Sequence, residues 1–135
     1  MYAVLVADDE HSYELYSQGR AAMDRGDLEA AVKLFQKSCD ETPHFKTFEL
    51  LGECLLKLGK PGDAIVSLGA AVGLGSKPFR ALYLLAKTLE QTGRISEAIE
   101  KLDLALQINP NYKAAGDLRS QLERQLPGTS RSGNS

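Results

Sequence analysis

The fold is decided by one stretch that occurs three times, as QGRAAMDRGDLEAAVKLF at residues 18–35, as LGECLLKLGKPGDAIVSL at residues 51–68 and as LAKTLEQTGRISEAIEKL at residues 85–102. The copies start 33 and then 34 residues apart, and this regular period indicates an internal repeat rather than chance. In each copy, apolar residues fall at helical spacing on both sides of a central glycine, Gly26, Gly59 or Gly93. Each copy is therefore predicted to form a helix, a tight turn and a second helix.

The aligned positions keep the same residue types, small in some places and large and apolar in others. They are Leu15, Phe48 and Leu82; Gln18, Leu51 and Leu85; Gly19, Gly52 and Ala86; Ala22, Leu55 and Leu89; Ala31, Ala64 and Ala98; Val32, Ile65 and Ile99; and Phe35, Leu68 and Leu102. Small residues let two helices approach closely, and large residues fill the remaining space. The two helices of each copy are therefore predicted to pack as a pair.

These residues resemble the tetratricopeptide repeat family, whose pattern combines a Leu-Gly pair, an alanine with an aromatic residue about four positions later, and a closing proline. Pro43 and Pro110 stand at closing positions, whereas Gln18, Ala86 and Ser76 depart from the pattern. The resemblance covers roughly residues 12–112. It implies an all-α, right-handed α-solenoid of three helix-turn-helix repeats.

A stack of helix pairs leaves the apolar side of its last pair uncovered, so a capping helix is expected. Ala115, Leu118 and Leu122 form an apolar stripe on an otherwise polar helix and predict this cap. The expected organisation is an apolar and acidic segment at 1–11, a repeat domain at 12–126 with repeats at about 12–44, 45–78 and 79–112 and a cap at 113–126, and a disordered tail at 127–135. The expected helices lie at about 9–25, 28–41, 45–58, 61–74, 78–92, 95–108 and 111–126, with Pro61 in a first turn.

The composition argues against several classes of protein. The 135 residues are 43% hydrophobic and 25% charged, with a formal net charge of -2, which is typical of a soluble domain without a basic field for nucleic acid. Neither a signal peptide nor a membrane-spanning run is recognisable, so no membrane insertion is expected. Two cysteines and two histidines have no zinc-site spacing, and no metal or cofactor is expected. The prediction is a cytoplasmic protein.

One local pattern suggests a different fold. Residues 4–10 look like the first strand and acidic pair of a response-regulator receiver. The residues that follow have helical periodicity, whereas a receiver alternates strands and helices. The similarity of residues 4–10 to a receiver is therefore interpreted as a coincidence. Asp8 or Asp9 is then expected to cap the first helix.

The cysteines and histidines are interpreted as structural. Cys39 and Cys54 could come near each other on stacking, and buried free thiols are favoured over a redox pair. His11 and His44 lie near helix starts without a nucleophile or carboxylate at a meaningful spacing, so surface or capping roles are favoured. An enzyme is the least favoured class.

The resemblance implies a concave binding groove lined by the first helix of every repeat. Tyrosines and leucines occur there among charged residues, more than a solvated helix face needs. The predicted groove residues are Tyr13, Tyr16, Arg20, Glu49, Leu50, Glu53, Arg80, Tyr83, Leu84 and Lys87, flanked by Ser17, Asp24, Lys46, Lys57 and Gln91. Leu50 and Leu84 are expected to form an apolar floor.

Some members of the family hold the C-terminal carboxylate of chaperone tails in a five-residue clamp of Lys, Asn and Arg. The corresponding residues here are Tyr16, Arg20, Leu50, Arg80 and Leu84. Only Arg80 keeps the expected charge, so capture of such tails is disfavoured.

The expected function is a non-enzymatic interaction module that binds a peptide or helix of a partner protein in the groove. Two alternatives stay open. One is an assembly or secretion chaperone that keeps a client soluble, and the other is a self-assembling unit whose apolar N-terminal segment fills a neighbour's groove or end face.

Overall fold

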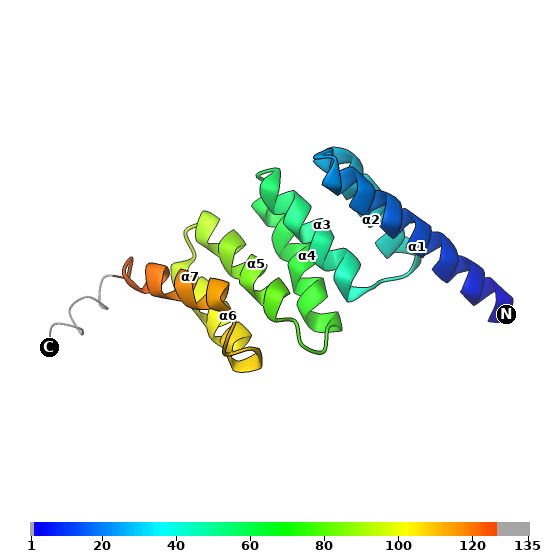
Figure 1. Ribbon diagram of the computed structural model, residues 1–135. Helices are drawn as coiled ribbons and strands as arrows, with labels where there is room; N and C mark the ends of the chain where they lie inside the picture. The colour runs from blue at the N-terminus through cyan, green and yellow to red at the C-terminus, as the bar shows by residue number, and fades with distance from the viewer. Residues whose placement is uncertain (1, 127–135) are drawn as a thin grey trace, which may run out of the picture. The chain divides into compact units, whose positions relative to one another are not determined.

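The computed structural model describes the backbone of residues 2–126 and the side chains of residues 9–126. Within residues 2–126 the chain forms seven helices and no strands (Figure 1). The helices are α1 (Tyr2–Asp24), α2 (Leu28–Glu41), α3 (Phe45–Lys57), α4 (Pro61–Leu74), α5 (Phe79–Gln91), α6 (Ile95–Ile108) and α7 (Lys113–Glu123). The predicted all-α class is confirmed. The predicted disordered tail at 127–135 lies outside the described residues.

The chain divides into two compact units, with the boundary between Gly75 and Ser76. In the first unit α2 packs against both α1 and α3, and α3 also pairs with α4. In the second unit α6 packs against both α5 and α7. The first unit therefore holds two helix pairs, and the second holds the third pair and the final helix.

A glycine ends the first helix of each pair in the same way. Gly26, Gly59 and Gly93 have φ angles of 81°, 73° and 80°, in the left-handed region where a Cβ is costly. After Gly26, the Asp27 amide donates to the Ala22 carbonyl at 2.9 Å, while the Gly26 amide donates to Met23 at 3.0 Å. The same two bonds recur around the other two glycines. The repeated glycine is therefore a helix C-terminal motif that reverses the chain.

Close approach within each pair depends on the small-residue positions. A Cβ added at Gly19 would lie 2.7 Å from Phe35 Cδ1, and one added at Gly52 would lie 2.5 Å from Leu68 Cδ2. Phe35 and Leu68 are fully buried. The prediction that small residues on one helix accommodate large ones on the other is confirmed in these two pairs.

The first helix starts earlier than expected. It begins at Tyr2 rather than near residue 9, because the apolar run before Asp9 contains no proline or glycine to stop a helix. Asp9 therefore lies inside α1, and its predicted capping role is wrong; the side chain of Asp8 is outside the described residues. Caps do form at Asp27, which accepts from the Ala30 amide, and at His44.

The final helix covers α6 as the apolar stripe predicts. Ala115 and Leu122 are fully buried, and Leu118 is half-buried. Arg119 pairs with Asp103 on α6 and with Glu123 on its own helix. The helix is shorter than expected, ending at Glu123 rather than near residue 126.

Candidate functional site

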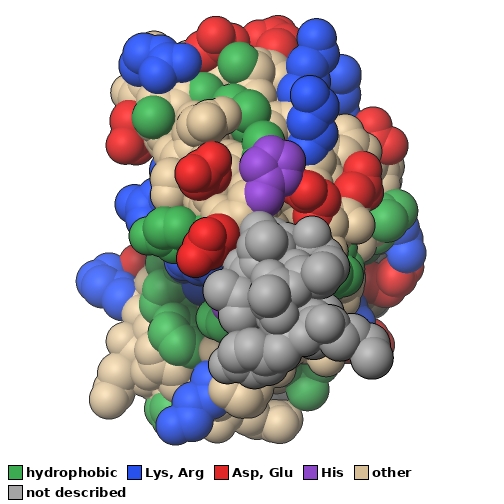
Figure 2. All heavy atoms as spheres, turned by 90° about the vertical axis from the view of Figure 1, so that its right-hand side faces the viewer, with side chains coloured by type: hydrophobic (Ala, Val, Ile, Leu, Met, Phe, Trp, Pro, Cys, Tyr) green, Lys and Arg blue, Asp and Glu red, His purple; other side chains and the backbone are tan. Residues whose placement is uncertain are grey.

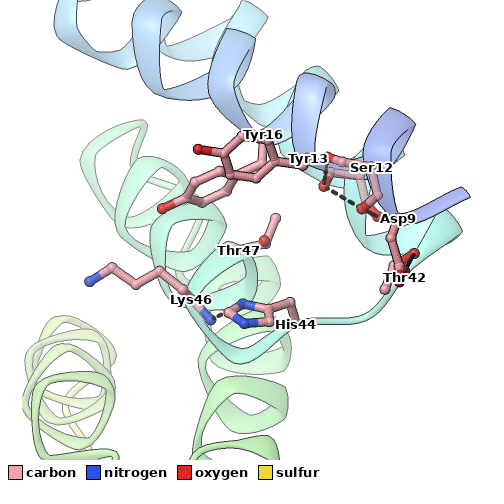
Figure 3. Close-up of a pocket in the computed structure, with 9 residues that line it drawn as sticks. Asp9, Ser12, Tyr13, Tyr16, Thr42, His44, Lys46 and Thr47 are labelled. Atoms are coloured by element: carbon pink, nitrogen blue, oxygen red, sulfur yellow. Dashed lines mark hydrogen bonds between the residues drawn. The ribbon is translucent and has the colours of Figure 1, made fainter. Parts of the chain in front are cut away.

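A cavity of about 440 Å³ opens in the first unit between α1 and the start of α3 (Figure 3). The end of α2 and the loop after it complete the wall. The lining residues are Asp9, Ser12, Tyr13, Tyr16, Ser38, Thr42, His44, Lys46 and Thr47. A volume of this size is within the range of small-ligand pockets and accommodates side chains of a bound segment.

Two tyrosines of α1 form one wall of the cavity. Their rings project from the helix toward the start of α3 (Figure 3), with centroids 6.0 Å apart. Tyr16 also contacts the buried ring of Phe35 at 6.1 Å. Tyr13 is 66% exposed. Tyr16 is thus fixed by its contact with the core, while the exposed ring of Tyr13 offers a large apolar surface to a ligand.

The buried polar wall of the cavity is already satisfied by the protein itself. The Ser12 hydroxyl donates to the Ser38 carbonyl at 3.0 Å, and the Ser38 hydroxyl donates to the Ser12 carbonyl at 2.7 Å. Buried hydroxyl groups need such partners. This reciprocal pair joins α1 to α2 and fixes the position of the tyrosine wall.

The opposite wall is held by His44 and Lys46. Nδ1 of His44 accepts a hydrogen bond from the Lys46 amide at 3.2 Å, which caps α3. Nζ of Lys46 lies 2.8 Å from Oε1 of Glu49, whose side chain is buried. The positive charge of this lysine is therefore balanced within the protein. The predicted capping role is confirmed for His44, whereas Nδ1 of His11 pairs with Glu41 at 2.6 Å.

Two of the predicted groove residues of the first unit, Tyr13 and Tyr16, line the cavity. Arg20 is exposed one turn further along α1. Glu53 is half-buried and pairs with Lys57.

Glu49 and Leu50 are buried, because α3 lies between α2 and α4 and is covered on two sides. Leu50, which the sequence predicts as part of an apolar floor, therefore presents little surface to a ligand.

The predicted residues of the second unit lie on α5. Leu84 is buried, so it too offers no exposed floor. The ring of Tyr83 packs edge-on against Tyr112 at 5.5 Å, and Nζ of Lys87 stands 5.7 Å from the Tyr83 centroid. Arg80, Tyr83 and Lys87 are each half-buried. Part of the Tyr83 surface that was predicted to contact a ligand is therefore covered by Tyr112 and Lys87.

Several cavity residues were not among the predicted groove residues. Ser12, Ser38, Thr42 and Thr47 line the cavity from four places along the chain. Small polar residues are common on any solvated helix face, so their type alone does not indicate a binding site. For Thr42, the repeat period gives one indication, because it predicts that the segment after residue 41 leads directly into the next helix.

Among residues 9–126, no group of three or more His, Cys, Asp or Glu side chains could hold a metal ion. Cys39 and Cys54 are buried and free, as predicted. Burial raises the pKa of each thiol to about 11, and the neighbouring Asp40 and Glu53 contribute in the same direction. No helix in the described part of the chain is long and apolar enough to cross a membrane.

Both thiols are expected to resist alkylation in the folded protein, because the thiolate is the reactive form and burial suppresses it. Iodoacetamide at about pH 8 should leave Cys39 and Cys54 unmodified, and both should react once the protein is unfolded in guanidinium chloride. Intact-mass spectrometry measures the added groups. Rapid modification of either cysteine before unfolding would contradict the burial of that thiol.

The sequence matches two family profiles. The tetratricopeptide repeat profile matches residues 49–113. The profile described as anaphase-promoting complex, cyclosome, subunit 3 matches residues 1–71. Together they span the three predicted repeats.

Longer proteins contain similar segments. DnaJ homolog subfamily C member 3 of Gallus gallus is 29% identical over 113 residues, which is 82% of this chain and 22% of that protein. Sperm-associated antigen 1 of Mus musculus is 27% identical over 81% of this chain and 12% of its own length. The chain thus spans a small part of both relatives.

Solved structures share the fold. The first TPR of Spaghetti (RPAP3), bound to the HSP90 peptide SRMEEVD, has a TM-score of 0.83 at 17% identity, covering 87% of this chain and 94% of that one. The type III secretion chaperone SycD of Yersinia enterocolitica, in complex with a peptide of the translocator YopD, has a TM-score of 0.74 at 26% identity. That match covers 90% of this chain and 93% of the chaperone chain.

Proposed function

Because the chain belongs to the tetratricopeptide repeat family, we propose that it is a non-enzymatic interaction module that binds a peptide or helix of a partner protein. The proposed site is the cavity between α1 and α3 of the first unit. The observation that carries the proposal is the exposed ring of Tyr13 in the cavity wall, beside a second tyrosine that contacts the core. Tyrosine is among the residues most enriched at binding hot spots.

The preformed geometry of the cavity supports peptide binding. The Ser12 and Ser38 hydroxyls fix the two helices, and His44 fixes the start of α3, so little has to be ordered when a ligand binds. The secretion chaperone with a bound translocator peptide supports the same mode at 26% identity. The half-buried α5 residues Arg80, Tyr83 and Lys87 remain a predicted contact surface of the second unit. The proposed compartment is the cytoplasm, which suits two free cysteines.

Removing the Tyr13 ring is expected to weaken peptide binding by about 30-fold or more, the loss typical of a hot spot. A display library of short random peptides is selected on the wild-type protein, and the enriched peptides are synthesised. Isothermal titration calorimetry then compares the wild type with Tyr13→Ala. Because this side chain is 66% exposed, the variant should keep the melting temperature of the wild type.

Val66→Ala is the matched control, since Val66 is 73% exposed and lies outside this cavity. It should leave peptide affinity unchanged. If Tyr13→Ala and the wild type bind every selected peptide with equal affinity, the binding site does not lie at the cavity between α1 and α3. Failure of any peptide to be enriched would contradict peptide binding itself.

A second candidate function is a chaperone for a client protein, favoured by the match to the secretion chaperone over nearly the whole of both chains. A chaperone keeps its client soluble, whereas an adaptor only docks. Co-expression of a partner identified through the selected peptides, with and without this chain, separates the two roles. A partner that is equally soluble in both cases argues for the adaptor.

A further inference from the structure

We propose that the segment bound at this cavity is basic, and that one of its arginine or lysine side chains lies against Tyr13 among the carboxylates of Asp9, Glu10 and Glu14. The proposal deepens the proposed function and rests on it. It names the chemistry of the ligand, which is a cationic peptide of a partner protein.

The geometry begins with a second, more open depression of about 440 Å³ on α1, lined by Asp9, Glu10, Tyr13 and Glu14. It shares Asp9 and Tyr13 with the tyrosine-lined cavity, so the two hollows adjoin at these residues. Asp9 and Glu10 precede Tyr13 by four and three residues and are its neighbours on the helix surface, while Glu14 lies four residues after Glu10 and lines the same depression. The ring face is apolar, and its surroundings are acidic.

Among the described side chains, no ion pair balances the charge of this face. Residues 1–19 contain four carboxylates and no lysine or arginine. Among the described side chains, Asp9, Glu10 and Glu14 form no ion pair, and Asp9 only accepts a long hydrogen bond from Thr42. The one lysine that lines the cavity, Lys46, is paired with Glu49. In Figure 2, acidic side chains lie on both sides of the histidine near the centre of the view.

An arginine or lysine satisfies both features at once. A cation within about 6 Å of a tyrosine centroid is attracted by the ring face, and carboxylates beside it form charge-assisted hydrogen bonds. The hydrocarbon stem of the same side chain covers the ring. An acidic ligand would instead meet three like charges, which costs binding energy.

Binding is tested with three fluorescently labelled peptides of equal length and equal leucine content, whose remaining residues are arginine, glutamine or glutamate. Fluorescence anisotropy should show that the arginine peptide binds the wild type at least about tenfold more tightly than the glutamine peptide and that the glutamate peptide binds weakest. Its affinity should fall as ionic strength rises. The triple variant Asp9→Asn, Glu10→Gln, Glu14→Gln should lose about tenfold or more of the arginine-peptide affinity.

The matched control changes the net charge by the same amount elsewhere. Glu29→Gln, Asp63→Asn and Glu100→Gln remove three exposed carboxylates that line neither hollow, so both triple variants move the formal charge from -2 to +1. The control should keep the arginine-peptide affinity. Equal losses in both variants would mean long-range attraction only and would overturn the proposal.

Two further outcomes separate this inference from the function on which it rests. If library-selected peptides bind in a Tyr13-dependent way but the three carboxylates have no influence, the basic ligand is wrong and the interaction module stands. If light scattering shows a dimer of the wild type that the carboxylate variant abolishes, the occupant is a second copy of this chain and the partner peptide is overturned.

Discussion

Replacing Gly52 with leucine is expected to lower the free energy of unfolding by about 3 kcal/mol or more, because the new side chain enters a fully packed contact. Even a Cβ at this position would lie 2.5 Å from Leu68 Cδ2, closer than real Cβ contacts allow. Leu68 is fully buried, so it cannot turn out into solvent without uncovering apolar surface. Overpacking must therefore push α3 away from α4, at the contact that holds the second helix pair together.

Gly69→Ala is the control that separates overpacking from the general effect of replacing a helical glycine. A Cβ at Gly69 meets nothing within 4 Å. Because alanine is a better helix former, this variant should be more stable by about 0.5–1 kcal/mol. Urea denaturation followed by circular dichroism measures both variants. An unchanged unfolding midpoint for Gly52→Leu would mean that the helices of the pair do not meet at Gly52.

The repeat period made most of the fold predictable. Helix ends follow from Gly26, Gly59 and Gly93, because the turn geometry tolerates glycine and disfavours a side chain. The start of α1 was missed, since an apolar run followed by acidic residues fits both a strand and a helix when no neighbouring element is known.

The site was less predictable than the fold. Tyr13 and Tyr16 could be found because they are large residues on a face that should be polar. The burial of Leu50 could not be predicted from the sequence. Periodicity on one helix identifies a single core face, whereas α3 is covered by both α2 and α4. The role of Thr42 and Ser38 depends on packing between elements, which one helix face does not reveal.

Deleting residues 111–135 is expected to destabilise the second unit severely, because α7 buries Leu122 and Ala115 completely and its loss uncovers the face of α6 on which it packs. The deletion also removes Tyr112, whose ring contacts Phe79 at 5.0 Å and Tyr83 at 5.5 Å. Burying a single leucine side chain is worth about 2 kcal/mol, so the summed loss amounts to several kcal/mol. Thermal melts should show a lower midpoint, and light scattering should show aggregation through the uncovered apolar face.

Two controls make this prediction specific to the apolar stripe of α7. Deleting only residues 128–135 removes none of the described contacts and should leave the melt unchanged. In the full chain, Leu122→Ala should cost about 2–5 kcal/mol by leaving a cavity, whereas Leu104→Ala, at a side chain that is 43% exposed, should cost far less. Similar melts for the long and the short deletion would contradict the capping role. A Leu122→Ala variant as stable as Leu104→Ala would locate the stabilising contacts of α7 elsewhere, at Tyr112 or at the Arg119 ion pair with Asp103.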